Sequence, residues 1–260
     1  MLREMLTVML TIVTTALQSE QQQRKHSTAH TQLYSNGYHH GRHPLKRPII
    51  NCTEVIAPTD SHPVRSPQSI HSAITKYINA VSLVEIGTRS GDGMACFAQV
   101  AAKSIAVEMD PPACRRLQER SQALGASGNR TFEIKCAAYQ QLSLDADVFT
   151  WWQQEPELRN AEVLSHLGRQ QQAGTIRATA MAILLFEKGF SQDMHSFRIL
   201  QNSSSWVEEV SFDETALCKR KYKHKPWFRK RAAGSYFVMG MKIADEPFSK
   251  NRNPIKAVSH

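Results

Sequence analysis

The chain has 260 residues, of which 41% are hydrophobic and 21% are charged. This composition is typical of a folded domain and excludes a disordered tail, a collagen-like fibre and a protein with many membrane spans. The chain has 32 Lys and Arg residues against 23 Asp and Glu, and the resulting net charge of +9 suits an anionic partner.

The five cysteines are scattered along the chain and form no CxxC or Cys/His finger pattern. Their spacing excludes a zinc ribbon and argues against a scaffold held together by disulfides. No group of histidines and acids has the spacing of a metal site, so no bound metal is predicted.

Residues 1–18 form a separate N-terminal piece. One basic residue, Arg3, precedes an apolar stretch over 5–17 that is too short to cross a bilayer. The pattern is typical of a signal or targeting peptide cleaved after Ala16, and it predicts a protein of the secretory pathway or of an organelle. An apolar helix on a cytoplasmic protein is the alternative. Residues 19–68 are rich in Gln, His, Ser, Arg and Pro, and we expect a low-complexity linker or arm there.

Helical and strand-like periodicities alternate from residue 69 onward. Helices are expected over 69–80, 94–103, 112–124 and 162–172. Strands are expected over 81–87, 104–110, 131–136, 147–151, 179–186, 205–212 and 235–243. This alternation predicts an α/β, Rossmann-like doubly wound sheet of seven mostly parallel strands, with a C-terminal antiparallel hairpin. The domain is expected to span 69–245, and residues 246–260 to form a tail.

The turn after the first expected strand carries the chemistry. Gly87 and Gly91 stand where a backbone must turn sharply and approach a ligand, and the free N–H groups of the next helix face that ligand. Glu85 precedes the turn. Glu108 ends the second strand, where an acid can accept hydrogen bonds from both hydroxyls of a ribose. A nicotinamide-dinucleotide site is the competing interpretation, but Cys96 stands where that fingerprint needs Gly or Ala.

This combination resembles the class I S-adenosylmethionine-dependent methyltransferases. Their first motif is an acid, a hydrophobic residue and then Gly-x-Gly-x-Gly, and residues 85–91 match it with Arg89 at the middle glycine. The resemblance covers roughly residues 69–243 and includes the closing hairpin. It implies S-adenosyl-L-methionine as cofactor, bound by Glu85, Gly87, Arg89, Gly91, Glu108 and Asp147. In this set Glu108 is the ribose-binding acid, Asp147 opens the fourth strand, and Arg89 is placed to pair with the carboxylate of the cofactor. An empty site in the same fold is the alternative.

The acceptor side follows the fourth expected strand, where the family places its reaction-specific residues. Trp151 and Trp152 either form an aromatic wall for a flat or cationic methyl acceptor, or one of them lies in the core while the other covers a helix. Glu187, at the tip of the fifth strand, and His195, in the following loop, are candidate catalytic bases for a hydroxyl or carboxyl acceptor. In-line transfer from a sulfonium can also proceed by positioning alone.

Positive charge is concentrated in the insertion 219–231, which holds eight Lys or Arg, three aromatic residues and no acid. Such a loop can bind a polyanion, because the cations release counterions and the rings stack on bases or sugars. The contacts are expected from Lys221, Lys223, Trp227 and Arg229. A solvated insertion or a sorting signal is the other interpretation.

Two functions from different classes follow from these features. The first is an S-adenosylmethionine-dependent methyltransferase. Its acceptor would be an anionic polymer, such as RNA, an acidic glycan or an acidic protein, or the hydroxyl or carboxyl group of a small molecule. The second is a non-catalytic domain of the same fold that binds a polyanion through residues 219–231.

Overall fold

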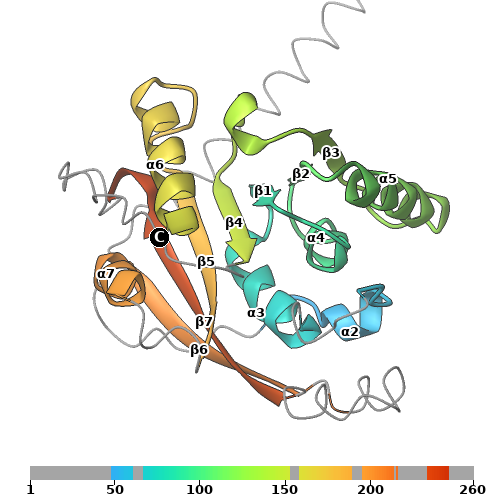
Figure 1. Cartoon of the computed structure of the whole chain (residues 1–260). Helices are drawn as coiled ribbons and strands as arrows, with labels where there is room; N and C mark the ends of the chain where they lie inside the picture. Colours follow the sequence, from blue (N-terminus) through green and yellow to red (C-terminus); the bar gives the residue numbers. More distant parts are fainter. Residues whose placement is uncertain are drawn as a thin grey trace, which may run out of the picture. The chain divides into compact units, whose positions relative to one another are not determined.

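A seven-stranded sheet forms the centre of the fold, with the strand order β3-β2-β1-β4-β5-β7-β6 (Figure 1). The strands are β1 Ser82–Ile86, β2 Lys103–Glu108, β3 Glu133–Cys136, β4 Val148–Trp152, β5 Met181–Glu187, β6 Trp206–Asp213 and β7 Ala233–Lys242. Strands β1 to β5 pair in parallel, and β7 runs antiparallel to both β5 and β6. This arrangement confirms the predicted doubly wound sheet and its closing hairpin.

The structure is a computed structural model that describes residues 48–60, 67–152, 158–188, 195–213, 215 and 233–245. Several predictions concern residues outside these ranges. They are the signal segment 1–18, the part of the expected linker before residue 48, the basic insertion 219–231 and the tail 246–260.

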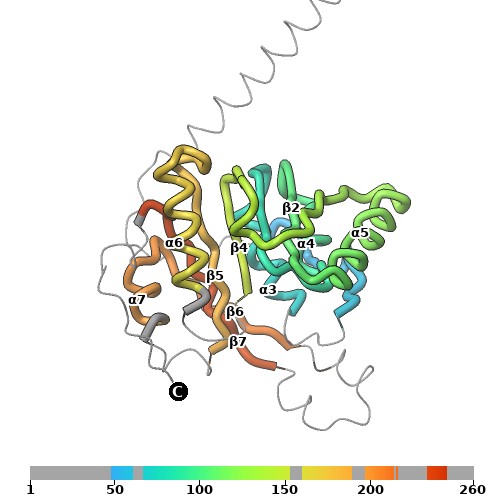
Figure 2. The backbone as a smooth tube through the Cα atoms, turned by 45° about the horizontal axis from the view of Figure 1, so that its top comes forward, coloured from blue at the N-terminus to red at the C-terminus, as the bar shows by residue number. Residues whose placement is uncertain are grey.

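Helices cover both faces of the sheet (Figure 2). They are α2 Cys52–Val55, α3 Gln68–Ile78, α4 Asp92–Phe97, α5 Pro111–Ala126, α6 Leu158–Gln172 and α7 His195–Ser203, with short 3-10 turns η2 Tyr139–Gln141 and η3 Ile243–Asp245. On one face, Ile74 of α3 and Leu117 of α5 pack against the sheet, and on the other Leu164 of α6 does so. Strand β1 contributes to the cores on both faces of the sheet. Leu83 points toward α3 and α5, and Val84 points toward α6.

Helix α4 is shorter than predicted, since it ends at Phe97 instead of continuing to residue 103. Lys103 already begins β2 and lies opposite Ser82, so the chain must turn before it. The backbone N–H of Ala102 donates to the carbonyl of Val81 at 2.8 Å, which fixes this turn at the entrance to the sheet.

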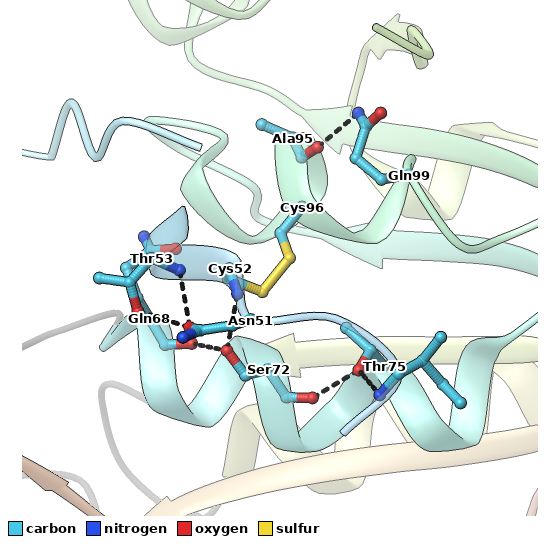
Figure 3. Close-up of a disulfide and its surroundings, with 10 residues drawn as sticks. Asn51, Cys52, Thr53, Gln68, Ser72, Thr75, Ala95, Cys96 and Gln99 are labelled. Atoms are coloured by element: carbon cyan, nitrogen blue, oxygen red, sulfur yellow. Dashed lines mark hydrogen bonds between the residues drawn. A yellow bond between two sulfur atoms is a disulfide. The ribbon is translucent and has the colours of Figure 1, made fainter. Parts of the chain in front are cut away.

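Residues 48–60, expected as part of a linker, belong to the folded domain. Cys52 is fully buried, and its backbone N–H donates to Oγ of Ser72 in α3 at 2.9 Å. A disulfide joins Cys52 to Cys96 of α4, with their Cα atoms 5.5 Å apart (Figure 3). The linker prediction is wrong for this segment, because Cys52 and Ile56 fill the core that α3 and α4 share.

A second disulfide joins Cys114, in the first turn of α5, to Cys136 at the end of β3. The prediction against disulfides is therefore wrong for four of the five cysteines, and Cys218 lies outside the described residues. The partners are 44 and 22 residues apart in sequence, so no local motif marks them. Only the fold brings each pair within bonding distance.

Two further absences hold for the described part of the chain, which leaves out residues 1–47, the internal gaps given above and residues 246–260. None of its helices has the length and apolar character that a membrane crossing requires. No three of its His, Cys, Asp and Glu side chains gather as the ligands of a metal ion would.

Candidate cofactor site

The carboxyl ends of β1 and β4 mark the point where the strand order reverses. From β1 the sheet continues through β2 and β3 on one side, and through β4 and β5 on the other. In open α/β sheets, ligands bind outside the carboxyl ends of the strands at this point. Residues 87–91, the predicted glycine turn, leave β1 here and enter α4. The structure thus brings the turn, Glu85 and Glu108 to the edge at which such a sheet binds its ligand.

The glycine turn contains three residues with left-handed backbone conformations, with φ of +75° at Gly87, +55° at Arg89 and +75° at Gly91. A Cβ atom added at Gly87 would meet no atom within 4 Å, so this part of the backbone borders open space. One added at Gly91 would lie 2.5 Å from Cδ2 of Leu117 in α5. Gly87 therefore suits the close approach of a ligand, whereas Gly91 allows the turn to pack against α5.

Glu108 holds the turn in place through contacts with backbone N–H groups. Its Oε2 accepts the N–H of Arg89 at 2.9 Å, and its Oε1 accepts those of Met109 and Asp110 at 2.8 and 3.0 Å. An ionised carboxylate offers about four acceptor positions, so roughly one, on Oε2, is left for a ligand hydroxyl. The sequence predicted contacts with both hydroxyls of a ribose, and the structure leaves capacity for one.

Glu85 is the buried acid of the site, with 2% of its surface exposed. Burial raises the pKa of its carboxyl group to about 8, although hydrogen bonds from the Trp152 and Thr88 side chains lower it. The charges of Asp92 and Glu108 add to the rise. Within the described residues, Oε2 of Glu85 has no hydrogen-bond partner. At neutral pH this carboxyl group is therefore mostly protonated, and one of its oxygens can still accept a hydrogen bond.

Thr150 of β4 is the register partner of Glu85 on β1. The preceding pair, Leu83 and Val148, both belong to the core beneath α3 and α4, and residues two positions further along a strand return to the same face. Thr150 is fully buried, and its Oγ1 also has no partner among the described residues. An unsatisfied buried polar group costs about 1–3 kcal/mol, so a ligand that donates hydrogen bonds to these two atoms would recover that free energy.

His71 of α3 belongs to the site, although sequence reasoning missed it. A Cβ atom on Gly93 would lie 3.1 Å from both Nε2 of His71 and Oε1 of Glu85, so these side chains flank the glycine. The His71 ring meets Trp152 edge-on, with the centroids 5.3 Å apart. Complete burial lowers the pKa of His71 to about 4, although the negative charge of Asp92 acts in the other direction and raises it. The imidazole is therefore neutral at pH 7.

The two adjacent tryptophans point to opposite faces of the sheet, because side chains alternate along a strand. Trp151 is buried among α6 residues, and its Nε1 donates to Oδ1 of Asn160 at 2.7 Å. Trp152 is half-buried on the other face, between the rings of His71 and Tyr236. The alternative of a wall formed by both tryptophans is therefore wrong, and the alternative that places one of them in the core holds for Trp151. Trp152 alone lies near Glu85.

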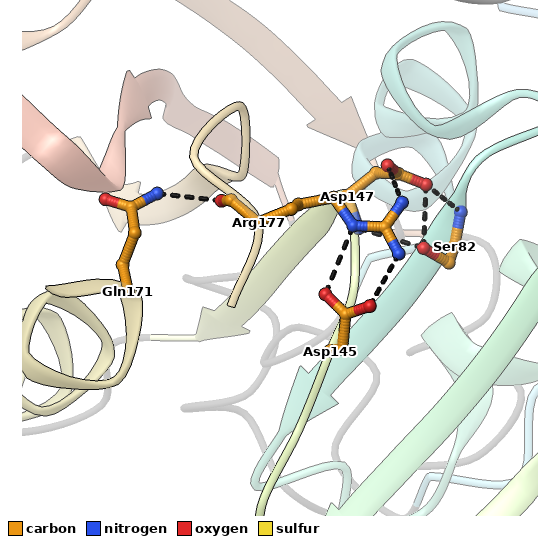
Figure 4. A network of polar contacts seen from close by, with 5 residues as sticks. All are labelled: Ser82, Asp145, Asp147, Gln171 and Arg177. Carbon is orange, nitrogen blue, oxygen red and sulfur yellow. Dashed lines mark hydrogen bonds and ion pairs between the residues drawn. The ribbon is translucent and has the colours of Figure 1, made fainter. Parts of the chain in front are cut away.

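Asp147 lies at the opposite edge of the sheet, where β1 and β4 begin (Figure 4). Its Oδ2 accepts the backbone N–H and the hydroxyl of Ser82 at 2.8 and 2.7 Å. Arg177 forms ion pairs with both Asp147 and Asp145. The predicted role of Asp147 in cofactor binding is wrong, because an acid that opens a parallel strand stands a full strand away from the ligand edge.

A buried ion pair fastens the N-terminal segment beside the glycine turn. Asp92, the first residue of α4, accepts the backbone N–H groups of Thr59 and Asp60, each at 2.9 Å. It also lies 2.7 Å from Nη1 of Arg120 in α5, whose Nη2 donates to the carbonyl of Ala57 at 3.1 Å. Residues 57–60 are thus tied to both helices that follow the site's strands.

The remaining predicted residues lie partly outside the described part of the chain. Glu187 ends β5 at the carboxyl edge, half-buried and opposite Tyr236 of β7. His195 begins α7 instead of lying in a loop, and its side chain is not among those described. The predicted acceptor contacts Lys221, Lys223, Trp227 and Arg229 lie outside the described residues.

The reversed β7, which closes the hairpin with β6, is the strand that the resemblance implied. The fold is a Rossmann-like doubly wound sheet with an antiparallel C-terminal hairpin. No family model and no curated protein matches the sequence.

Several solved structures are similar to this chain. One is a SAM-dependent methyltransferase from Thiobacillus denitrificans in complex with S-adenosyl-L-homocysteine, with a TM-score of 0.46, 12% identity, and coverage of 73% of this chain and 96% of that chain. Another is magnesium protoporphyrin IX methyltransferase from Synechocystis with bound SAM, with a TM-score of 0.45, 13% identity, and coverage of 66% and 78%. A third is an RNA methyltransferase from Salinibacter ruber, with a TM-score of 0.44, 11% identity, and coverage of 72% and 94%.

Proposed function

We propose that this domain binds S-adenosyl-L-methionine at the carboxyl edge of β1, β2 and β4 and acts as a methyltransferase. The observation that carries the proposal is the buried carboxyl group of Glu85, whose Oε2 has no partner among the described residues, beside a glycine turn that opens to space at Gly87. A cationic cofactor with a flat base and a ribose fits this combination, because it supplies donors to Glu85 and passes close to a bare backbone.

Three residues at the glycine turn and at the end of β2 have a role in this proposal. Gly87 lets the cofactor approach the backbone. Glu108 accepts one ribose hydroxyl on Oε2 while its other hydrogen bonds hold the turn. Arg89 is exposed beside the turn, where its guanidinium can pair with the carboxylate of the cofactor.

The bound cofactor supplies an electrophilic methyl group on a sulfonium. Transfer to an acceptor is an in-line displacement, so the task of the protein is to hold the two reactants aligned and to exclude water. Trp152 offers a half-buried ring next to Glu85, which can face a cationic centre. For the acceptor, the basic insertion 219–231 supports an anionic polymer, and the alternative is a hydroxyl or carboxyl group of a small molecule.

The test is a calorimetric and thermal-shift titration of the full chain with S-adenosylmethionine and S-adenosylhomocysteine. Ligand at about 100 times its Kd should stabilise the fold by about 2.7 kcal/mol. Glu108→Ala should weaken binding, whereas Glu133→Ala, which removes an exposed glutamate on the neighbouring strand β3, should not. Absence of both heat and stabilisation with wild-type protein would overturn the cofactor assignment. Salt-sensitive binding of a polyanion without cofactor affinity would favour a non-catalytic domain instead.

We also infer that the protein works in an oxidising compartment. The two disulfides, Cys52–Cys96 and Cys114–Cys136, support this inference, because structural disulfides are rare in the reducing cytosol. Alkylation of the denatured, unreduced protein followed by peptide mass spectrometry should leave these four cysteines unmodified. Modification of all four in protein isolated from its native source would contradict the inference.

A further inference from the structure

We propose that Glu85 is protonated in the ligand-free domain and that a cationic group of the ligand, entering between Glu85 and Thr150, displaces this proton. Ligand binding would then release a proton from the protein. This inference rests on the proposed function, since it concerns the same edge of the sheet, and it adds the protonation state and Thr150 to it.

Two buried polar atoms without hydrogen-bond partners in the described ranges belong to register partners on the same face of the sheet. Glu85 and Thr150 face each other across the β1–β4 pair, at the point where the strand order reverses. Both side chains are almost fully buried, and neither Oε2 of Glu85 nor Oγ1 of Thr150 has a hydrogen-bond partner in the described ranges. Strands in a sheet lie about 4.8 Å apart, so one small donor group can reach both oxygens. An ammonium group fits, because it has three N–H donors and no acceptor.

The surroundings of Glu85 disfavour its negative charge when no ligand is bound. The neighbouring charged groups are Asp92 at the start of α4 and Glu108 at the end of β2, and both are acids. The guanidinium of Arg120 in α5 forms its ion pair with Asp92. His71 of α3 is neutral at pH 7 because of its own burial.

The uncharged donors around Glu85 do not replace a cation. The indole of Trp152 on β4 and the hydroxyl of Thr88 lower the pKa of the carboxyl group, yet burial outweighs them and leaves that pKa at about 8. On the far side of Trp152, the ring of Tyr236 from β7 packs edge-on at 5.3 Å. A cation supplied by the ligand would reverse this balance, because an opposite charge within about 4–6 Å favours the ionised carboxylate.

The proton balance of the step is simple. The carboxyl group of Glu85 loses its proton to solvent, and the resulting carboxylate pairs with a ligand ammonium that keeps its own three protons. As pH increases toward the pKa of Glu85, the ligand affinity should therefore rise about tenfold for each pH unit. Above that pKa the affinity should level off. The hydroxyl of Thr150 accepts one of the ammonium hydrogens, and it carries no charge in either state.

The experiment is isothermal calorimetry of the full chain at pH 6.5 in phosphate and in imidazole, two buffers with different ionisation enthalpies. At this pH an α-amino group is fully protonated, so a difference in heat between the buffers reports protons released by the protein. S-adenosylhomocysteine carries an ammonium group, whereas methylthioadenosine keeps the nucleoside but lacks the amino acid. We expect release of about one proton with the first ligand and none with the second.

Variants separate the two residues. Glu85→Gln should bind S-adenosylhomocysteine at least tenfold more weakly and release no proton, while Thr150→Val should bind more weakly and still release it. Glu209→Gln, in an exposed ion pair with Lys188, is the matched control and should behave as wild type. Binding of S-adenosylhomocysteine without proton release, or release that persists in Glu85→Gln, would overturn this inference alone. Failure of every adenosyl ligand to bind would instead overturn the proposed function.

Discussion

The carboxylate of Asp92 lies 2.7 Å from the guanidinium of Arg120, and the exposed fractions of these side chains are only 1% and 11%. Asp92 is also the residue that accepts the backbone N–H groups of Thr59 and Asp60. One buried charge therefore connects α4, α5 and the N-terminal segment beside the glycine turn.

Removal of one partner should leave an uncompensated charge in the core. We expect Arg120→Met to lower the free energy of unfolding by about 2–4 kcal/mol, because Asp92 stays buried without its cation. Urea denaturation followed by circular dichroism measures the loss. Arg115→Met, at an exposed position of the same helix, is the control and should change little. If the double variant Asp92→Asn, Arg120→Met were as unstable as Arg120→Met alone, the ion pair would not be the cause.

A substitution of Asp147 tests whether this residue stabilises the fold or binds the cofactor. Asp147→Ala should destabilise the domain by about 1–3 kcal/mol, because it removes the acceptor of the partly buried backbone N–H and hydroxyl of Ser82 at the start of β1. It should leave the Kd for S-adenosylhomocysteine unchanged, since the residue stands at the amino edge of the sheet. Denaturation and calorimetry on the same preparation measure both quantities. If Asp147→Ala lost much of its affinity for S-adenosylhomocysteine while keeping the stability of the wild type, Asp147 would belong to the cofactor site after all.

Gly87 and Gly91 form a matched pair, because both have φ of +75° and so the same backbone cost for alanine, about 1 kcal/mol. Gly91→Ala must in addition displace Leu117, which lies 2.5 Å from the new Cβ, and we expect a loss of about 3 kcal/mol in total. Gly87→Ala should cost only the backbone term but weaken ligand binding. The prediction fails if the two variants are equally stable when measured by thermal denaturation.

The pH dependence of stability should report Glu85. Its pKa is about 8 in the folded state and 4.5 in its reference state, so between these values the folded protein keeps a proton that the unfolded chain releases. The free energy of unfolding must therefore fall as pH rises through this range. His71 has the opposite effect, because its pKa is lowered from 6.5 to about 4 and it costs stability as pH falls through that interval.

The two effects overlap below pH 6.5 and separate above it. We expect wild-type protein without ligand to lose about 2 kcal/mol between pH 6.5 and 8, and Glu85→Gln to show no such fall. Chemical denaturation at several pH values checks this. The variant should also be more stable than wild type at pH 8, and equal slopes for the two proteins would show that Glu85 is not the titrating group.

The strands could be predicted because a buried parallel strand leaves a local pattern in the sequence. Runs such as 81–87 and 104–110 are rich in branched residues and end where a turn or an acid follows, and the structure contains β1 and β2 within them. The glycine turn and its two acids were predictable for the same reason, since each lies within a few residues of a strand end.

The predictions that were wrong concern contacts between residues far apart in sequence, or the face of the sheet to which a side chain points. The pairing of Cys52 with Cys96 leaves no trace in the spacing of the cysteines. Trp151 and Trp152 point to opposite faces because side chains alternate along a strand. The expected strand 147–151 ended before Trp152, so this alternation was not applied to the second tryptophan.

His71 left a weaker signal. It lies three and seven residues before Ile74 and Ile78, in the apolar stripe of its helix, which is an unusual place for a histidine. The stripe predicts that His71 is buried, but only the structure shows that Glu85 and Gly93 are beside it.

The two disulfides join cysteines that are consecutive along the chain, the first with the second and the third with the fourth. The partner of Cys52 and the partner of Cys114 are therefore each the next cysteine along the chain to leave the ribosome. The first bridge closes around α3, β1 and the glycine turn, and the second closes around most of α5 and β3. The two bonds can thus form in the order of translation, the first once α4 has been made and the second once β3 has been made.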